Sequence, residues 1–199
     1  MHGIKHELKD DFKYEIDIPV EEKIDIKLLN KNTHFLTGDI EEDNIKKAIK
    51  WIMYENMCDH VPEKKLTLYI NSMGGELYQA FALIDIMKTS KYPIITIGLG
   101  CIMSAAFLIF SAGSKGHRYI APNTGIMCHQ FTDFMESKYH DIKAAMKEAE
   151  YCNERMMEIL REASGLESRN IKSKLLGPSD AYFTPQELIE LNIADHIFN

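Results

Sequence analysis

A strand, a glycine turn and a helix follow one another twice in this sequence, and this repetition constrains the fold more than any other feature. The first unit has alternating apolar residues over 65–70, then Gly74-Gly75, then a helical pattern over 76–88. The second has an apolar run over 94–97, two more glycines, and an apolar helix after Ser104. Two successive units of this kind predict a parallel sheet with right-handed crossovers. Sites in such sheets form at the carboxyl ends of the strands, so we expect the functional site beside these glycines.

The remaining pattern completes an α/β domain. A long helix is predicted over 139–164, with an apolar stripe from Ile142 to Ala163 and Gly165 as its stop. An earlier helix should begin at 41–44 and bury Ile45, Ala48, Ile49, Ile52 and Met53. Short strands are expected at 35–40, 118–120, 126–129 and 193–197, and short helices at 168–176 and after Thr184, where a capping box includes a proline at the first helical position.

The first 31 residues are charged and weakly patterned. We interpret residues 1–31 as an N-terminal arm that is flexible, with a short strand near 24–29. Residues 32–199 then form a single domain, because a chain of 199 residues suits one domain with a sizeable core.

Composition excludes several classes of function. Hydrophobic residues make up 45% of the chain and charged residues 27%, as in globular proteins. The net charge of -7, without a basic block, argues against a general binder of nucleic acid or anionic membranes. No apolar run is long enough to span a bilayer, and the N-terminus lacks the apolar core of a secretory signal, so we expect a cytoplasmic protein.

The four cysteines are scattered and show no metal-site spacing, so we expect no metal and a reducing compartment. Cys128 and His129 are adjacent, but neighbouring side chains on a strand point to opposite faces, which makes a shared metal ion improbable.

Ser104 is the first candidate for chemistry. Glycines before it allow a sharp turn, and the helix after it presents free N–H groups and a positive dipole end. A serine oxygen held there has the surroundings that a nucleophile in acyl transfer requires. Taken singly, however, Ser104 could merely cap the helix, His129 could be an ordinary strand-end histidine, and Asp180 an ordinary turn residue.

Together these residues form a recognisable set. Asn71-Ser-Met-Gly-Gly75, the turn around Ser104, Ile126-Met-Cys-His129-Gln130 and the Asp180 loop before a small helix resemble the Clp protease proteolytic subunit, in this order and at very nearly its separations. The resemblance covers about residue 35 to the C-terminus. It implies an α/β fold of the crotonase and ClpP type, with repeated β-α units and a long helix after the core sheet. It also implies a serine endopeptidase that cleaves unfolded polypeptides in an ATP-dependent protease.

The resemblance assigns a role to each site residue. Ser104 would be the nucleophile, His129 the general base, and Asp180 the carboxylate that orients the imidazole. The backbone N–H groups of Gly75 and Ala105 would form the oxyanion hole.

The resemblance also implies partners. The chain would bind no cofactor itself, and ATP would be used by a partner AAA+ unfoldase of the ClpX, ClpA or ClpC type. Homo-oligomeric rings, heptameric and stacked in pairs, would enclose the active sites.

Four features depart from the family pattern. Met73 stands where the family usually has proline, and Ala105-Ala106 replace the usual Met-Gly. Residues 131–137 contain no glycine, whereas the family has a glycine-rich strand there that lines the substrate channel and reaches the opposite ring. The N-terminal arm lacks the expected motif for axial loops that meet the ATPase. These departures fall in the parts of the family pattern that form the double ring, the peptide-docking edge and the contact with a standard unfoldase.

Three alternatives therefore remain open. A crotonase-type acyl-CoA hydratase or isomerase would use the same N–H donors for an enolate, with Glu76 as the only carboxylate near the turn. A non-catalytic ring subunit would share the fold without the activity. A stand-alone processing peptidase, such as one that matures viral capsid precursors, would share the chemistry but not the partner.

Overall fold

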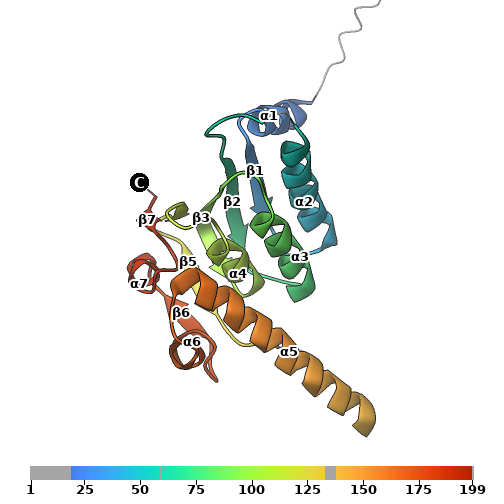
Figure 1. Cartoon of the computed structure of the whole chain (residues 1–199), viewed down its shortest axis with the longest axis vertical. Helices are drawn as coiled ribbons and strands as arrows, with labels where there is room; N and C mark the ends of the chain where they lie inside the picture. The colour runs from blue at the N-terminus through green and yellow to red at the C-terminus, as the bar shows by residue number, and fades with distance from the viewer. Residues whose placement is uncertain (1–18, 59, 133–137, 199) are drawn as a thin grey trace, which may run out of the picture.

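The computed structural model describes residues 19–58, 60–132 and 138–198, which form one central sheet flanked by helices (Figure 1). The strands are β1 (Thr33–Thr37), β2 (Leu66–Ser72), β3 (Ile94–Met103), β4 (Arg118–Ile120), β5 (Gly125–Cys128), β6 (Ala181–Phe183) and β7 (His196–Ile197). The helices in this part of the chain are α1 (Val20–Leu29), α2 (Glu42–Met57), α3 (Leu77–Lys88), α4 (Ala105–Ser111), α5 (Tyr139–Ser164), α6 (Ser168–Lys174) and α7 (Pro185–Glu190).

The sheet has the predicted parallel core. Strands β1, β2, β3 and β4 are hydrogen-bonded in that order, and each pair is parallel. The long strand β3 pairs with β4 through its first half and with β5 through its last three residues. The short strand β6, which the sequence pattern did not predict, runs antiparallel to β5. The α/β fold expected from the repeated β-α units is confirmed.

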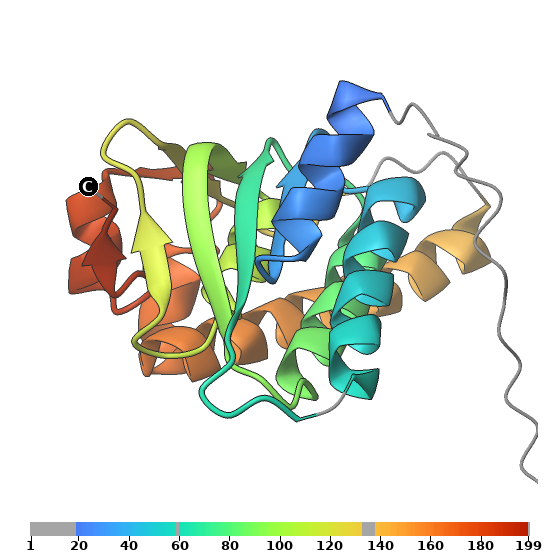
Figure 2. The same cartoon turned by 90° about the horizontal axis from the view of Figure 1, so that it is seen from above.

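Helix α4 is the centre of the packing. All seven of its residues are buried, and it contacts β2, β3, β5, α3 and α5. Helices α2 and α3 lie side by side in both views (Figures 1 and 2), and α3 buries an apolar face that includes Phe81 and Ile84. Strand β2 alternates strictly between buried and half-buried positions. The nucleophile candidate Ser104 thus immediately precedes the most buried helix of the described chain.

The prediction of a strand near 24–29 was wrong, because these residues belong to helix α1. The alternation Ile24-Asp-Ile26 resembles a strand, but no neighbouring strand pairs with it among the described residues. Glutamates in the first turn and Lys27 in the last turn instead favour a helix through its dipole. Of the predicted arm over residues 1–31, residues 1–18 lie outside the described residues.

Helix α5 has the predicted bounds, but its apolar stripe is only half buried. Its second half buries Cys152, Met156 and Leu160. Ile142 and Met146 are 42% and 60% exposed, because the first half of α5 projects beyond the body of the domain (Figure 1). On α2, similarly, Met53 is exposed and Trp51 occupies the core in its place.

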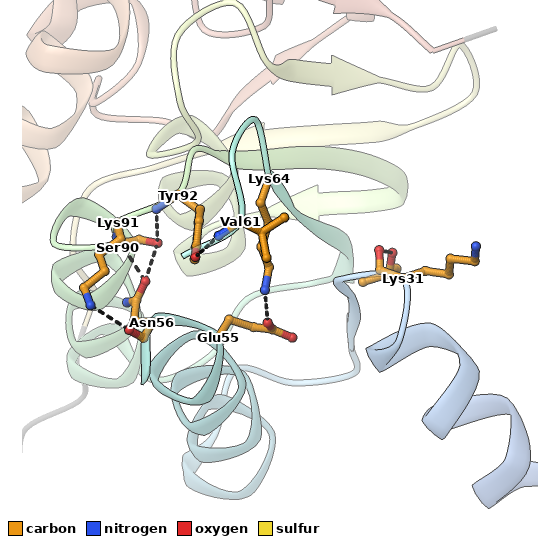
Figure 3. A network of polar contacts seen from close by, with 9 residues as sticks. Lys31, Glu55, Asn56, Val61, Lys64, Ser90, Lys91 and Tyr92 are labelled. Atoms are coloured by element: carbon orange, nitrogen blue, oxygen red, sulfur yellow. Dashed lines mark hydrogen bonds and ion pairs between the residues drawn. The ribbon is translucent and has the colours of Figure 1, made fainter. Parts of the chain in front are cut away.

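A polar network holds the end of α2 against the segment that leads into β3 (Figure 3). The Asn56 side-chain oxygen accepts hydrogen bonds from the Ser90 hydroxyl and the Lys91 backbone N–H. Next to it, the Lys64 ammonium donates to the Glu55 carboxylate at 2.5 Å, and both side chains are buried. Pairing and hydrogen bonding offset the cost of burying these two charges.

The C-terminal segment is fastened by Arg118 of β4, which is fully buried. Its guanidinium donates to both Asp195 carboxylate oxygens and to the backbone carbonyls of Ala163 and Asn192.

The predicted capping box of α7 is confirmed, since the Thr184 hydroxyl accepts a hydrogen bond from the Glu187 backbone N–H and the Glu187 carboxylate accepts one from the Thr184 backbone N–H. The final strand is shorter than predicted and contains only His196 and Ile197. No described helix is long and apolar enough to cross a membrane.

Candidate active site

Ser104 lies in a strained turn between β3 and α4. Its backbone has φ 52° and ψ −123°, in a region that residues with a Cβ rarely adopt. The Ser104 N–H donates to the Met127 carbonyl at 3.0 Å, which ties the turn to β5. The side chain makes no capping hydrogen bond to α4, and its Oγ lies 2.8 Å from His129 Nε2. The turn therefore directs the hydroxyl to the imidazole and not to the helix.

The glycines before Ser104 do not form this turn, contrary to the prediction. Strand β3 continues through Gly98 and Gly100 to Met103. A Cβ at Gly98 would lie 2.8 Å from the Ile120 side chain, and one at Gly100 would lie 2.5 Å from Asn71 Oδ1. These glycines therefore permit close packing along the strand, and Ser104 itself makes the turn.

His129 follows the last residue of β5, as predicted for a strand end. Its Nδ1 lies 2.5 Å from the Gln130 carbonyl oxygen, which can only accept a hydrogen bond. The proton is therefore assigned to Nδ1, and Nε2 is left as an acceptor for the Ser104 hydroxyl. This is the tautomer that a general base for Ser104 requires. The Gln130 side chain donates to the carbonyls of Leu176 and Gly177 and so joins the residue next to His129 to the segment that leads to Asp180.

Asp180 immediately precedes β6 and lies one residue beyond its ladder with β5. The antiparallel ladder between β5 and β6 pairs Met127 with Tyr182 and Cys128 with Ala181. The next position in the same register would pair His129 with Asp180. Among the described residues no hydrogen bond joins the two side chains, and Asp180 is exposed. The predicted role of Asp180 stays a prediction.

Gly75 and Ala105 provide two backbone donors beside Ser104. Gly75 has φ +144°, and a Cβ there would lie 2.4 Å from the Ile40 carbonyl oxygen, so that only glycine fits. Ala105 is the first residue of α4, where helix N–H groups have no partner within the helix. Neither N–H group donates a hydrogen bond to a backbone carbonyl in the described ranges. The neighbouring Gly74 approaches closely too, since a Cβ there would lie 2.7 Å from the Ser104 Cβ.

A cavity of about 320 Å³ joins these groups. Its lining brings together four of the five predicted site residues, Gly75, Ser104, Ala105 and His129, and leaves Asp180 outside. The cavity is also lined by residues that the sequence analysis did not assign to the site, namely Leu77, Tyr78, Gln130, Phe131, Thr132 and Met156. Tyr78 and Leu77 follow Gly75 at the start of α3, so their position after the glycine turn could have indicated them.

The neighbouring thiol is poorly suited to chemistry. Burial raises the pKa of Cys128 to about 12, despite a backbone hydrogen bond from His129 that acts in the opposite direction. A thiol of that pKa is almost entirely protonated at neutral pH and is a weak nucleophile. No group of three or more His, Cys, Asp or Glu side chains within the described ranges could hold a metal ion.

Comparison with known proteins identifies the family. A family model described as Clp protease matches residues 20–199. The ATP-dependent Clp protease proteolytic subunit 1 of Prochlorococcus marinus subsp. pastoris is 30% identical over 173 residues, which cover 87% of this chain and 86% of the relative. The subunit of the same name from Leifsonia xyli subsp. xyli is 27% identical over 181 residues, which cover 91% and 90%. These relatives favour a peptidase over an acyl-CoA hydratase. The chain belongs to the Clp protease family of peptidases.

Proposed function

We propose that this chain is the serine endopeptidase subunit of a self-compartmentalising, ATP-dependent protease, with one peptidase domain over residues 32–199. It would cleave unfolded polypeptides through an acyl-enzyme intermediate. The single observation that carries the proposal is the 2.8 Å contact between Ser104 Oγ and His129 Nε2 in a cavity that Gly75 and Ala105 also line.

The first step is acylation of Ser104. The hydroxyl oxygen attacks the carbonyl carbon of the scissile bond, and His129 Nε2 takes the hydroxyl proton. The Nδ1–H is already directed at the Gln130 carbonyl, so no change of tautomer precedes the attack. The imidazolium then gives its Nε2 proton to the leaving amine as the C–N bond breaks.

The second step is hydrolysis of the ester. A water molecule attacks the acyl carbon while His129 Nε2 takes its proton, and the proton passes to Ser104 Oγ as the C–O bond breaks. In both steps a tetrahedral oxyanion forms, which the N–H groups of Gly75 and Ala105 would hold. Removing one such donor typically costs about 100- to 1,000-fold in turnover.

Asp180 is proposed as the third member of the triad. The Gln130 carbonyl fixes the His129 tautomer, but it carries no full charge to stabilise the imidazolium that forms. Extending the β5–β6 ladder by one residue pair would bring the Asp180 carboxylate opposite His129. Paired Cα atoms in antiparallel strands lie about 4.5–5.5 Å apart, which is within reach of an aspartate side chain. Assembly or substrate binding would supply this extension.

The proposed partners follow from the family. The relatives are named as proteolytic subunits of an ATP-dependent protease, which supports association with other subunits and with a partner that uses ATP. We propose that the subunits form homo-oligomeric, heptameric rings stacked in pairs and that the partner is a AAA+ unfoldase. The exposed apolar side chains on the projecting half of α5 support self-association, since such surface is commonly covered in an oligomer. Residues 133–137, part of the segment without glycine, lie outside the described residues. We propose no cofactor for this chain, and a cytoplasmic location.

A fluorophosphonate probe tests the nucleophile. We expect the assembled protein to be labelled at Ser104 and to cleave a denatured protein, and Ser104→Ala to lose both activities. Ser173→Ala, an exposed serine on α6, is the matched control and should behave like the wild type. Native mass measurement on the same sample reports assembly. A protein that assembles but is neither labelled nor active would refute the proposal and identify a non-catalytic ring subunit.

A further inference from the structure

One residue of the active-site cavity is charged and has no assigned role. The walls include apolar side chains such as Leu77, Phe131 and Met156, together with uncharged polar residues. Glu76 also lines the cavity, and it is the one residue with a carboxylate among the lining residues. It follows Gly75, whose N–H is the proposed oxyanion donor.

The backbone of Glu76 is held firmly while its carboxylate is available. Its N–H donates to the Ile40 carbonyl at 2.7 Å, and its carbonyl accepts from the Ala80 N–H at 3.2 Å. The side chain is exposed, does not cap α3, and forms no hydrogen bond or ion pair with any residue in the described ranges. The backbone of Glu76 is therefore held in place beside Gly75, and its carboxylate has no partner among the described residues.

No ion pair within residues 19–58, 60–132 and 138–198 neutralises this carboxylate. Arg155 lies on the helix that contributes Met156 to the cavity wall, but its guanidinium stacks over Phe81 at 4.3 Å and over Tyr151 at 5.2 Å from the ring centroids. Arg155 is not among the residues that line the cavity. A cationic group on a bound molecule would therefore meet a carboxylate that no described side chain pairs with.

We propose that Glu76 makes the enzyme prefer polypeptides with a lysine or arginine side chain beside the scissile bond. The inference rests on the proposed peptidase function and adds the substrate class. The apolar walls would pack the aliphatic stem of such a side chain, and the carboxylate would meet its charged end. A second effect acts during the reaction, because an uncompensated carboxylate next to Gly75 opposes the negative charge that develops on the oxyanion. A bound cation removes this opposition.

The test compares matched fluorogenic peptides that carry lysine, norleucine or glutamate beside the scissile bond. Because Glu76 is exposed, solvent weakens the attraction between its carboxylate and a lysine ammonium of the peptide. We therefore expect kcat/KM for the lysine peptide to exceed that for the norleucine peptide by about fivefold. Glu76→Gln should reduce this ratio to about one, and Glu76→Lys should favour the glutamate peptide by a similar factor. Salt at about 1 M should weaken the wild-type preference, because screening then acts over about 3 Å.

Glu22→Gln is the matched control, since Glu22 is an exposed carboxylate in the first turn of α1 and does not line the cavity. It should retain the wild-type ratio. A second readout is independent of turnover: the lysine peptide should slow fluorophosphonate labelling of Ser104 more than the norleucine peptide does.

The experiments distinguish failure of the Glu76 inference from failure of the proposed peptidase function. A wild-type enzyme that is labelled and cleaves all peptides at equal rates would overturn the role of Glu76 and leave the peptidase intact. A protein that is neither labelled nor active would overturn both. Mapping of cleavage sites in a denatured protein gives an unbiased check, and sites without lysine or arginine enrichment would contradict the inference.

Discussion

Replacing Gly75 with alanine should remove most of the peptidase activity while leaving Ser104 and His129 in place. The new Cβ would lie 2.4 Å from the Ile40 carbonyl oxygen and 2.8 Å from its nitrogen, whereas ordinary contacts begin at 3.4 Å. The backbone at residue 75 must therefore retreat by about 1 Å. A displacement of this size in a group that positions the reaction can cost about 100-fold. Loss of one oxyanion donor costs about 100- to 1,000-fold.

We therefore expect kcat to fall by about 100- to 1,000-fold, which is about 2.7–4 kcal/mol of transition-state stabilisation. The assay is steady-state cleavage of a fluorogenic peptide, with circular dichroism and native mass to confirm the fold and the assembly. KM should change much less than kcat, because the donor acts mainly on the oxyanion.

Gly116→Ala provides the control for backbone strain. Gly116 also has a positive φ, of +79°, but a Cβ there would meet no atom within 4 Å. This variant should lose about 1–2 kcal/mol of stability and keep its activity. A folded, assembled Gly75→Ala enzyme with kcat within threefold of the wild type would refute the assignment of Gly75 to the oxyanion hole.

Three further predictions concern single side chains. Asp180→Asn should lower kcat by about 10⁴-fold if its carboxylate completes the triad, and a loss below tenfold in the assembled enzyme would leave the Gln130 carbonyl as the sole partner of Nδ1. Cys128 should resist iodoacetamide at pH 8 in the native protein, because its pKa of about 12 leaves only about one thiol in 10⁴ ionised, and rapid labelling seen by mass spectrometry would contradict its burial. Burial alone would raise the pKa of Asp195, but hydrogen bonds and charge from Arg118 outweigh it and lower that pKa. Its contribution to stability is therefore present above the unfolded pKa near 4 and is lost as the pH falls through the lower folded value. Urea unfolding of Asp195→Asn should show a large deficit at pH 7 that shrinks below pH 4, and a deficit independent of pH would refute the linkage.

The two central β-α units could be predicted because their signals are local. In β2 (66–72) buried residues recur at every second position, and in α3 (77–88) at every third or fourth position. Both periods can be recognised within a short stretch of sequence. Helix α1 was mistaken for a strand for the same reason. Its Ile24-Asp-Ile26 alternation is a local signal, whereas the lack of a partner strand is visible only in the folded protein.

The sequence predicted most of the residues that line the site, but not the backbone geometry that brings them together. Gly75, Ser104, Ala105 and His129 line one cavity, although the sequence alone assigned the turn to the glycines and not to Ser104. Strand β6 could not be predicted, because three residues carry no usable period and its existence depends on pairing with β5. The register of β6 against β5, which would pair Asp180 with His129 if the ladder continued, is likewise a property of distant segments.

Arg118 also makes the stability of the domain depend on Asp195, a residue far from it in the sequence. A chain that ends before residue 195 already contains Ser104 and His129, but it lacks the carboxylate that compensates this buried guanidinium. An unpaired charge in such a position strongly destabilises the folded domain. A chain truncated before residue 195 would therefore carry Ser104 and His129 without a stable domain to arrange them.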